Sequence, residues 1–171
     1  MLWRTHFFAG TTAGLMLTAS NPDIKTIAIS AGITGVSALL PDLDSPNSKL
    51  GRLVPIIPSV LSVTVGHRGA LHSFLGALGV SLAVTMLVKM WYACTFLELF
   101  LLILVGYMTH LLLDSLTNSG CPLFWPIKIR IRLPILNTGG LIERLIVLPA
   151  MIILFIWFSI PLVCNHLNIQ W

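Results

Sequence analysis

The sequence predicts an all-α protein, a polytopic transmembrane bundle of about five helices with long loops on one side and a short basic ribbon at the membrane interface. Of its 171 residues, 56% are hydrophobic and only 9% are charged, whereas a soluble domain carries about 25% charged residues. The apolar residues also gather in runs close to the roughly 20 residues that one membrane crossing needs. The length suits a single integral-membrane domain over residues 1–171, with the lipid bilayer as its main partner.

Five apolar runs define the expected helices. They lie at residues 6–19, 26–40, 70–88, 96–117 and 145–164. The first run also resembles a signal peptide, but we assign it to the bundle because His6 belongs to a polar pattern described below. The first two runs are short for full crossings, which indicates tilted or partly buried helices. Gly10 with Gly14, and less clearly Gly32 with Val36, have the spacing that lets helix backbones approach closely.

Two long links join these helices. Residues 41–69 contain four prolines, which exclude one regular helix, and their apolar run at 54–65 suggests an interfacial or re-entrant piece. Residues 127–133 alternate between apolar and basic side chains, which predicts the basic ribbon at headgroup level. The three cysteines are scattered, so we interpret them as apolar fillers of a reduced protein without disulfides.

The basic residues are distributed unequally between the two sides. One side carries Arg4, Lys49, Arg52, Arg68, Lys128, Arg130, Arg132 and Arg144, and the other carries only Lys25 and Lys89. By the positive-inside rule the first side is cytoplasmic, which places the N-terminus in the cytoplasm and the C-terminus outside. Basic residues at this position also contact anionic headgroups, so the net charge of +4 does not indicate a nucleic-acid partner.

Most of the His, Asp and Glu residues fall in four short clusters at the predicted cytoplasmic helix ends. These clusters are His6, Asp42 with Asp44, His67 with His72, and His110 with Asp114. His110 and Asp114 are one turn apart on one helix face. Ionisable groups near hydrocarbon are costly unless they are paired or hydrated, so both should face the bundle interior. A structural hydrogen-bonded pair would also account for these two residues taken alone.

The remaining clusters favour a bound cation. Asp42 and Asp44 follow a helix C-terminus, where the helix dipole disfavours carboxylates unless a metal or an arginine compensates them. The glycines of GHRGALHS permit a tight turn that lets His67 and His72 point the same way. Four imidazoles and three carboxylates without a thiolate suit Zn²⁺, Mn²⁺ or Fe. Seven donors allow two ions, or one ion with supporting partners.

Several motifs together resemble those of a known family. The segments LLPDLDSPNSKLGR, GHRGALHS, GYMTHLLLDSLTNSGCPLFWP and RIRLPI, followed by Glu143-Arg144, are similar to those of the YdjM-like inner-membrane proteins of bacteria, which are described as membrane-bound, metal-dependent hydrolases. A looser likeness, in residue types and order, connects them to zinc-dependent phospholipases C and related nucleases.

The resemblance implies a site and a reaction. The expected metal ligands are His6, Asp42, Asp44, His67, His72, His110 and Asp114. Zinc is the expected ion, with manganese or iron as alternatives, and its bound water would attack a phosphoester, of a lipid or another compound. Asp44 would orient or deprotonate that water, and Arg68 would act beside it in catalysis. Arg52, Arg68 and Arg132 would bind the substrate phosphate.

Two other functions stay open at this stage. A metal or ion transporter would usually carry its ionisable groups near the bilayer midplane, whereas here they lie at helix ends. A non-catalytic scaffold could use the same His/Asp cluster structurally, because ligand type alone does not separate structural from catalytic metal sites.

Overall fold

The computed structural model describes residues 1–21, 23–45, 48, 51–52, 69–127 and 129–167. Within these ranges the fold is all-helical and contains no β-strand, which confirms the predicted fold class. The five main helices are α1 (Trp3–Thr18), α2 (Ile24–Ser37), α5 (Phe74–Lys89), α6 (Phe96–Ser115) and α7 (Leu148–His166).

Three short elements extend these helices. The 3-10 helix η1 (Leu40–Asp44) follows α2, the 3-10 turn η2 (Ala70–His72) precedes α5, and the π-helical turn η3 (Glu143–Val147) precedes α7. By length and composition, the described segments able to cross a membrane are Ile24–Asp44, Phe96–Ser115 and Glu143–Cys164. The other two helices are shorter, with 16 residues each in α1 and α5.

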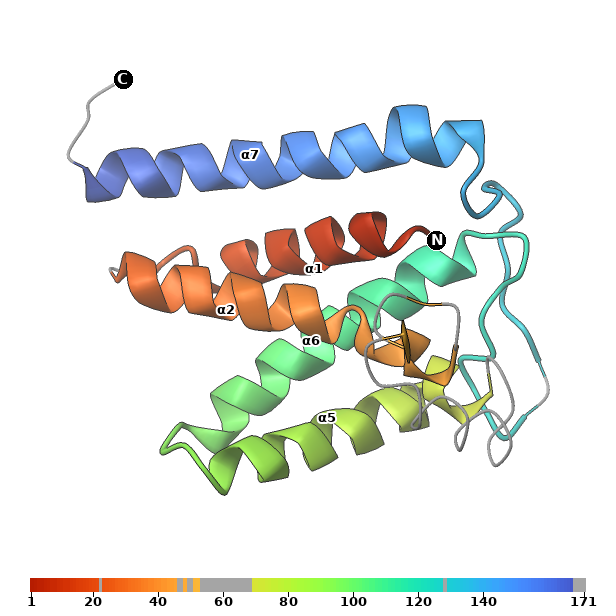
Figure 1. Ribbon diagram of the computed structural model, residues 1–171, viewed down its shortest axis with the longest axis horizontal. Coiled ribbons are helices and arrows are strands. Elements are labelled where there is room, and N and C mark those ends of the chain that lie inside the picture. The colour runs from red at the N-terminus through yellow and green to blue at the C-terminus, as the bar shows by residue number, and fades with distance from the viewer. Residues whose placement is uncertain (22, 46–47, 49–50, 53–68, 128, 168–171) are drawn as a thin grey trace.

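The helices are arranged so that η1, η2 and the described part of the link after α6 lie at one end of the bundle (Figure 1). The chain runs back and forth through α1, α2, α5, α6 and α7, and short turns connect α1 to α2 and α5 to α6 at the opposite end. Helices α1 and α2 form a hairpin packed on α6, α5 packs on α6, and α7 lies along α1. The alternation inferred from the sequence is therefore present, and it brings the starts of α1, α5 and α7 to the ends of α2 and α6.

Small residues bring α1, α2 and α6 into close contact around Thr34. A Cβ added to Gly10 would lie 2.6 Å from the carbonyl O of Thr34, and one added to Gly14 would lie 2.1 Å from its Oγ1. From the other side, a Cβ on Gly106 of α6 would lie 2.2 Å from the same carbonyl O. These contacts confirm the packing role predicted for Gly10 and Gly14, because no larger side chain fits there.

The second predicted packing pair, Gly32 with Val36, is wrong. A Cβ on Gly32 would meet no atom within 4 Å, and Val36 is 52% exposed. The face of α2 that packs on α1 instead contains Gly35, where an added Cβ would lie 2.4 Å from the side chain of Thr11. Both faces of α2 carry small residues at helical spacing, and the structure uses the one that contains Gly35.

The link after α6 folds back over the end of that helix. Leu133 donates its backbone N–H to the carbonyl O of Ser115 at 2.8 Å. Cys121 and Ile131 exchange two backbone hydrogen bonds of 2.9 Å each and form an isolated antiparallel bridge. Among its described residues, the alternating segment predicted as a ribbon forms no strand and pairs through Ile131 and Leu133. Residue 128 and the apolar run at 54–65 lie outside the described residues.

Candidate metal centre

A buried polar cluster occupies the end of the bundle where η1, η2 and the start of α1 meet the end of α6. Its members come from α1, η1, η2 and the last two turns of α6, and they are His6, Asp42, Asp44, His72, His110 and Asp114. All are at most 1% exposed except Asp42, whose side chain is 26% exposed. Six of the seven predicted ligands therefore lie in one cluster, and His67 lies outside the described residues.

Asp114 lies at the centre of the cluster. Its Oδ1 is 3.3 Å from Nε2 of His6, and its Oδ2 is 3.5 Å from Nε2 of His110 and 3.9 Å from Nε2 of His72. The Nε2 atom of His110 is also 3.9 Å from Oδ1 of Asp42. One carboxylate thus faces three imidazoles that come from three different elements.

The hydrogen bond made by His110 determines how its ring is protonated. Its Nδ1 lies 2.7 Å from the carbonyl O of Ala38, and because a carbonyl oxygen can only accept, Nδ1 must donate a proton. In the neutral ring, Nε2 then carries a lone pair directed toward Asp114 and Asp42. A lone pair facing two carboxylates requires either a second proton on the ring or a cation between the groups.

The rings of His6 and His72 also indicate that a proton or a cation is required in the cluster. Neither ring nitrogen of His6 or His72 forms a hydrogen bond with proper geometry among the described residues, although buried polar atoms are normally paired. The rings of His6 and His110 are stacked, with centroids 3.8 Å apart and an angle of 15° between planes. Two imidazolium ions stacked this closely would repel each other, so a cation that accepts imidazole lone pairs suits the pair better than two extra protons.

The donor spacing agrees with metal coordination. Two groups have ligand atoms that all lie within 4.8 Å of one another: His6 with His110 and Asp114, and Asp42 with His72 and His110. Donors held about 2.1 Å from one tetrahedral ion lie roughly 3.4 Å apart, close to the separations around Asp114. The residues present are therefore positioned to hold a metal ion, and their imidazole and carboxylate chemistry suits a divalent transition metal.

Asp44 is placed behind His72. Its Oδ2 lies 3.4 Å from Nδ1 of His72, while Nε2 of the same ring faces Asp114. A carboxylate on the far nitrogen of a ligating histidine fixes the ring orientation and raises its basicity. The structure thus gives Asp44 a contact suited to positioning His72, and its predicted action on water stays a prediction.

The turn that carries His72 is held by residues outside the predicted site. The hydroxyl of Tyr107 donates to the carbonyl O of Leu71 at 2.6 Å, and the thiol of Cys121 donates to the carbonyl O of His72 at 3.0 Å. Cys121 is buried in an apolar core, as its interpretation as an apolar filler implies, and it also adjoins the cluster. Tyr107 precedes His110 by three residues on the same helix face, so the sequence spacing could have predicted that Tyr107 lies near the cluster.

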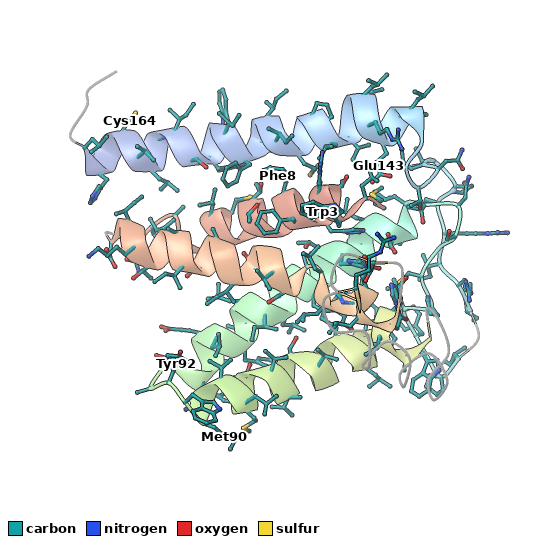
Figure 2. All side chains as sticks on the ribbon, viewed as in Figure 1. Trp3, Phe8, Met90, Tyr92, Glu143 and Cys164 are labelled. Atoms are coloured by element: carbon teal, nitrogen blue, oxygen red, sulfur yellow. The ribbon has the colours of Figure 1, made fainter. Side chains whose placement is uncertain are left out.

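Glu143 forms hydrogen bonds that hold the start of α1 beside the cluster. It is fully buried, and its Oε1 accepts from the backbone N–H of Leu2 at 2.6 Å and from the hydroxyl of Thr5 at 3.0 Å. Its Oε2 accepts from the N–H of Gly139 at 2.7 Å. Figure 2 shows Glu143 and Trp3 at the same end of the bundle. Glu143 thus joins the start of α1 to η3. The α-amino group of Met1 lies 2.6 Å from Oδ1 of Asp114.

The two described arginines of the predicted site, Arg52 and Arg132, form no ion pair with the carboxylates of this network. Arg68 lies outside the described residues. Their predicted roles in catalysis and phosphate binding stay predictions.

Comparison with known proteins identifies proteins that are similar to this chain. A family model described as "YdjM inner membrane protein" matches residues 1–168. The inner membrane protein YdjM of Escherichia coli (strain K12) is 36% identical over 127 residues, which cover 71% of this chain and 61% of that protein. The uncharacterized protein YvsG of Bacillus subtilis (strain 168) is 31% identical over 153 residues, covering 85% of this chain and 87% of that protein. No solved structure matches.

Proposed function

The chain belongs to the YdjM family of inner membrane proteins, and from this membership and the buried His/Asp cluster we propose that it is a membrane-bound, metal-dependent hydrolase of the bacterial inner membrane. The observation that carries the proposal is the convergence of three buried imidazoles on Asp114, of whose six ring nitrogens all but Nδ1 of His110 lack protein hydrogen-bond partners among the described residues. The Met1 amine balances charge at Oδ1 of Asp114 but leaves these imidazole nitrogens unpaired, which is costly unless they bind a cation.

The ion would be held by His6, His110 and Asp114, with His72 and Asp42 as further donors. Nδ1 of His110 is already committed to Ala38, so only Nε2 is available to a metal. Because the two candidate groups share this one nitrogen, the described residues support one ion at a time. Zinc is our first candidate and manganese or iron the alternatives, since all three accept imidazole with carboxylate.

A divalent transition metal supplies Lewis acidity and lowers the pKa of water toward neutrality, which is the chemistry that phosphoester hydrolysis requires. The side chains of the cluster would orient the metal ligands and accept the proton. The carboxylate of Asp44 orients His72. Asp42 is the one cluster carboxylate with partial solvent exposure. Either Asp42 or Asp44 can accept the proton released from attacking water. The buried side chains around them limit access of bulk water.

The cluster is proposed to face the cytoplasm. The described arginines on long links or helix starts, namely Arg4, Arg52, Arg130, Arg132 and Arg144, lie at the cluster end, whereas Lys25 and Lys89 lie at the other end. By the positive-inside rule the cluster end is cytoplasmic. A site at that depth is at the level of phospholipid headgroups, which makes a phosphoester the natural substrate class, in a lipid or in a compound at the membrane surface.

The proposal is tested first by metal content. The protein is purified in detergent without a histidine tag, and bound metals are counted by mass spectrometry. The variants His72→Ala and Asp114→Asn are compared with His166→Ala and Asp23→Asn, which make the same chemical changes away from the cluster. We expect a transition metal in the wild type and in both controls, and its loss in both cluster variants.

Hydrolysis is then measured with bis(p-nitrophenyl) phosphate in the presence of Zn²⁺ or Mn²⁺. Activity that requires the metal and disappears in Asp114→Asn would support the hydrolase. Folded protein that binds neither added ion would overturn the metal site. Tight metal binding without hydrolysis of any phosphoester tested would overturn the enzyme and leave a scaffold or a metal carrier.

A further inference from the structure

A basic pocket lies beside the metal centre, between the first turn of α1 and the start of α7. It has a volume of about 480 Å³ and is lined by Leu2, Trp3, Arg4, Arg144 and Leu148. The guanidinium carbon of Arg4 lies 5.6 Å from the ring centroid of Trp3. Figure 2 shows Trp3 at this end of α1, near the start of α7. An aromatic ring and two arginines at one helix end are typical of the membrane interface.

Both arginines of this pocket lack an acidic partner in the part of the chain that the structure describes. The ion pairs found there join histidines or the Met1 amine to aspartates, and none involves Arg4 or Arg144. Neighbouring Glu143 is occupied by Leu2, Thr5 and Gly139. Two guanidinium groups lining one pocket without a counter-ion attract an anion, and their planar donors suit the oxygens of a phosphate.

An apolar groove of about 460 Å³ lies further along the helices, between α1, α2 and α7 and toward the end of the bundle opposite the cluster. Its lining includes Thr11 and Leu15 of α1, Gly32 of α2, and Phe155, Ser159 and Leu162 of α7. The space in front of Gly32 is open, because a Cβ there would meet no atom within 4 Å. Groove walls of this composition, at the depth of membrane-crossing helices, suit a hydrocarbon chain.

The pocket and the groove follow one another along the same faces of two helices. On α1, Arg4, Thr11 and Leu15 are separated by seven and four residues, and on α7, Leu148, Phe155 and Ser159 have the same spacing. At 3.6 residues per turn, each set shares one helix face. The seam between α1 and α7 is therefore basic at the end that carries the candidate metal centre and apolar toward the opposite end.

We propose that this seam binds one membrane phospholipid, with its phosphate between Arg4 and Arg144 and an acyl chain in the groove. A phosphate alone would leave the groove unfilled, and a hydrocarbon alone would leave two arginines without a counter-charge. The lipid also bridges α1 and α7 beside Glu143, and so supports the helix that carries His6. This site goes beyond the proposed hydrolase and needs no metal.

The experiment measures phosphatidylglycerol retained per chain after detergent washing, together with the shift in melting temperature when the lipid is added back in mixed micelles. The double variant R4Q/R144Q is compared with R130Q, which removes a positive charge from the same end of the bundle outside the pocket. Gly32→Phe, which fills the groove, is compared with Gly79→Phe on α5, where an added Cβ would also meet no atom within 4 Å.

We expect stoichiometric lipid in the wild type, at least about tenfold weaker retention in R4Q/R144Q and in Gly32→Phe, and wild-type retention in R130Q and Gly79→Phe. Asp114→Asn should also retain the lipid, which separates this site from the metal centre. Equal loss in R130Q would overturn the pocket, and equal loss in Gly79→Phe would overturn the groove. Stabilisation of equal size by inorganic phosphate or by diacylglycerol alone would overturn the phospholipid as the ligand.

Discussion

Gly106→Ala is the substitution that tests most directly how the fold holds the metal centre together. The new Cβ would lie 2.2 Å from the carbonyl O of Thr34 and 2.9 Å from the Cβ of Ser37, both on α2. Non-bonded carbon and oxygen atoms need at least about 3 Å, so α2 would have to move away from α6 by roughly 1 Å. The same movement would stretch the 2.7 Å hydrogen bond from His110 to Ala38 beyond the normal range.

The cost follows from these two effects. Overpacking a helix contact and weakening a buried hydrogen bond both destabilise the folded protein. The better helix propensity of alanine offsets part of this loss, which leaves a net destabilisation of roughly 1 to 3 kcal/mol. For a chain of this size, each kcal/mol lowers the melting temperature by about 2–4 °C. Metal affinity should fall as well, because Nε2 of His110 would be displaced from Asp114.

Gly79→Ala is the matched control. It makes the same chemical change on an exposed face of α5, where an added Cβ would meet no atom within 4 Å, and should raise stability slightly through helix propensity. Melting in detergent and zinc affinity are measured for both variants. Gly106→Ala protein with the stability and zinc affinity of Gly79→Ala would refute the close approach of α2 and α6 and its role in placing His110.

Three further predictions concern other supporting groups. Tyr107→Phe removes the hydroxyl that donates to Leu71, so the turn carrying His72 should loosen and metal affinity should fall about tenfold; competition with a chromogenic chelator measures this, and unchanged affinity would contradict it. Glu143→Gln replaces a buried carboxylate that accepts three hydrogen bonds, which should cost roughly 1 to 3 kcal/mol and be visible as a lower melting temperature and faster proteolysis near the N-terminus. The pKa of Asp23 lies below its ordinary value, chiefly because the side chain of Thr26 donates a hydrogen bond to the carboxylate. Its contribution to stability is therefore present above the ordinary aspartate pKa and lost as the pH falls through the folded-state pKa. Asp23→Ala should accordingly melt below wild type at neutral pH, with a difference that shrinks in acid; a pH-independent difference would count against the cap.

The convergence of the cluster could be predicted because the chain has so few polar groups. In a bundle whose helices alternate in direction, His6, Asp42, His72 and Asp114 each stand at a helix end on the same side, and the cost of leaving them apart in hydrocarbon favours a shared site. The sequence pattern therefore indicated both the members and the end of the bundle where they meet. It did not indicate that Asp44 lies behind His72, since that depends on the path of a short 3-10 helix.

The wrong packing prediction for Gly32 arose because two faces of a helix have similar composition in apolar surroundings. Gly32 and Gly35 both have small neighbours at helical spacing, and in lipid the face against another helix is as apolar as the face against acyl chains. Periodicity alone therefore could not select Gly35. Cys121 is the buried apolar residue that was expected, but its contact with His72 could not be predicted, because that contact depends on how the link after α6 folds back.

The spread of the cluster along the chain has a consequence for biogenesis. Its members run from His6 to Asp114, so no metal centre can exist until the fourth main helix has left the ribosome, and at about 5–20 residues per second this takes many seconds. Glu143, which fastens the start of α1, arrives later still. During membrane insertion the nascent chain therefore passes through an interval in which all described candidate donors are present but the hydrogen bonds of Glu143 to Leu2 and Thr5 have not yet formed.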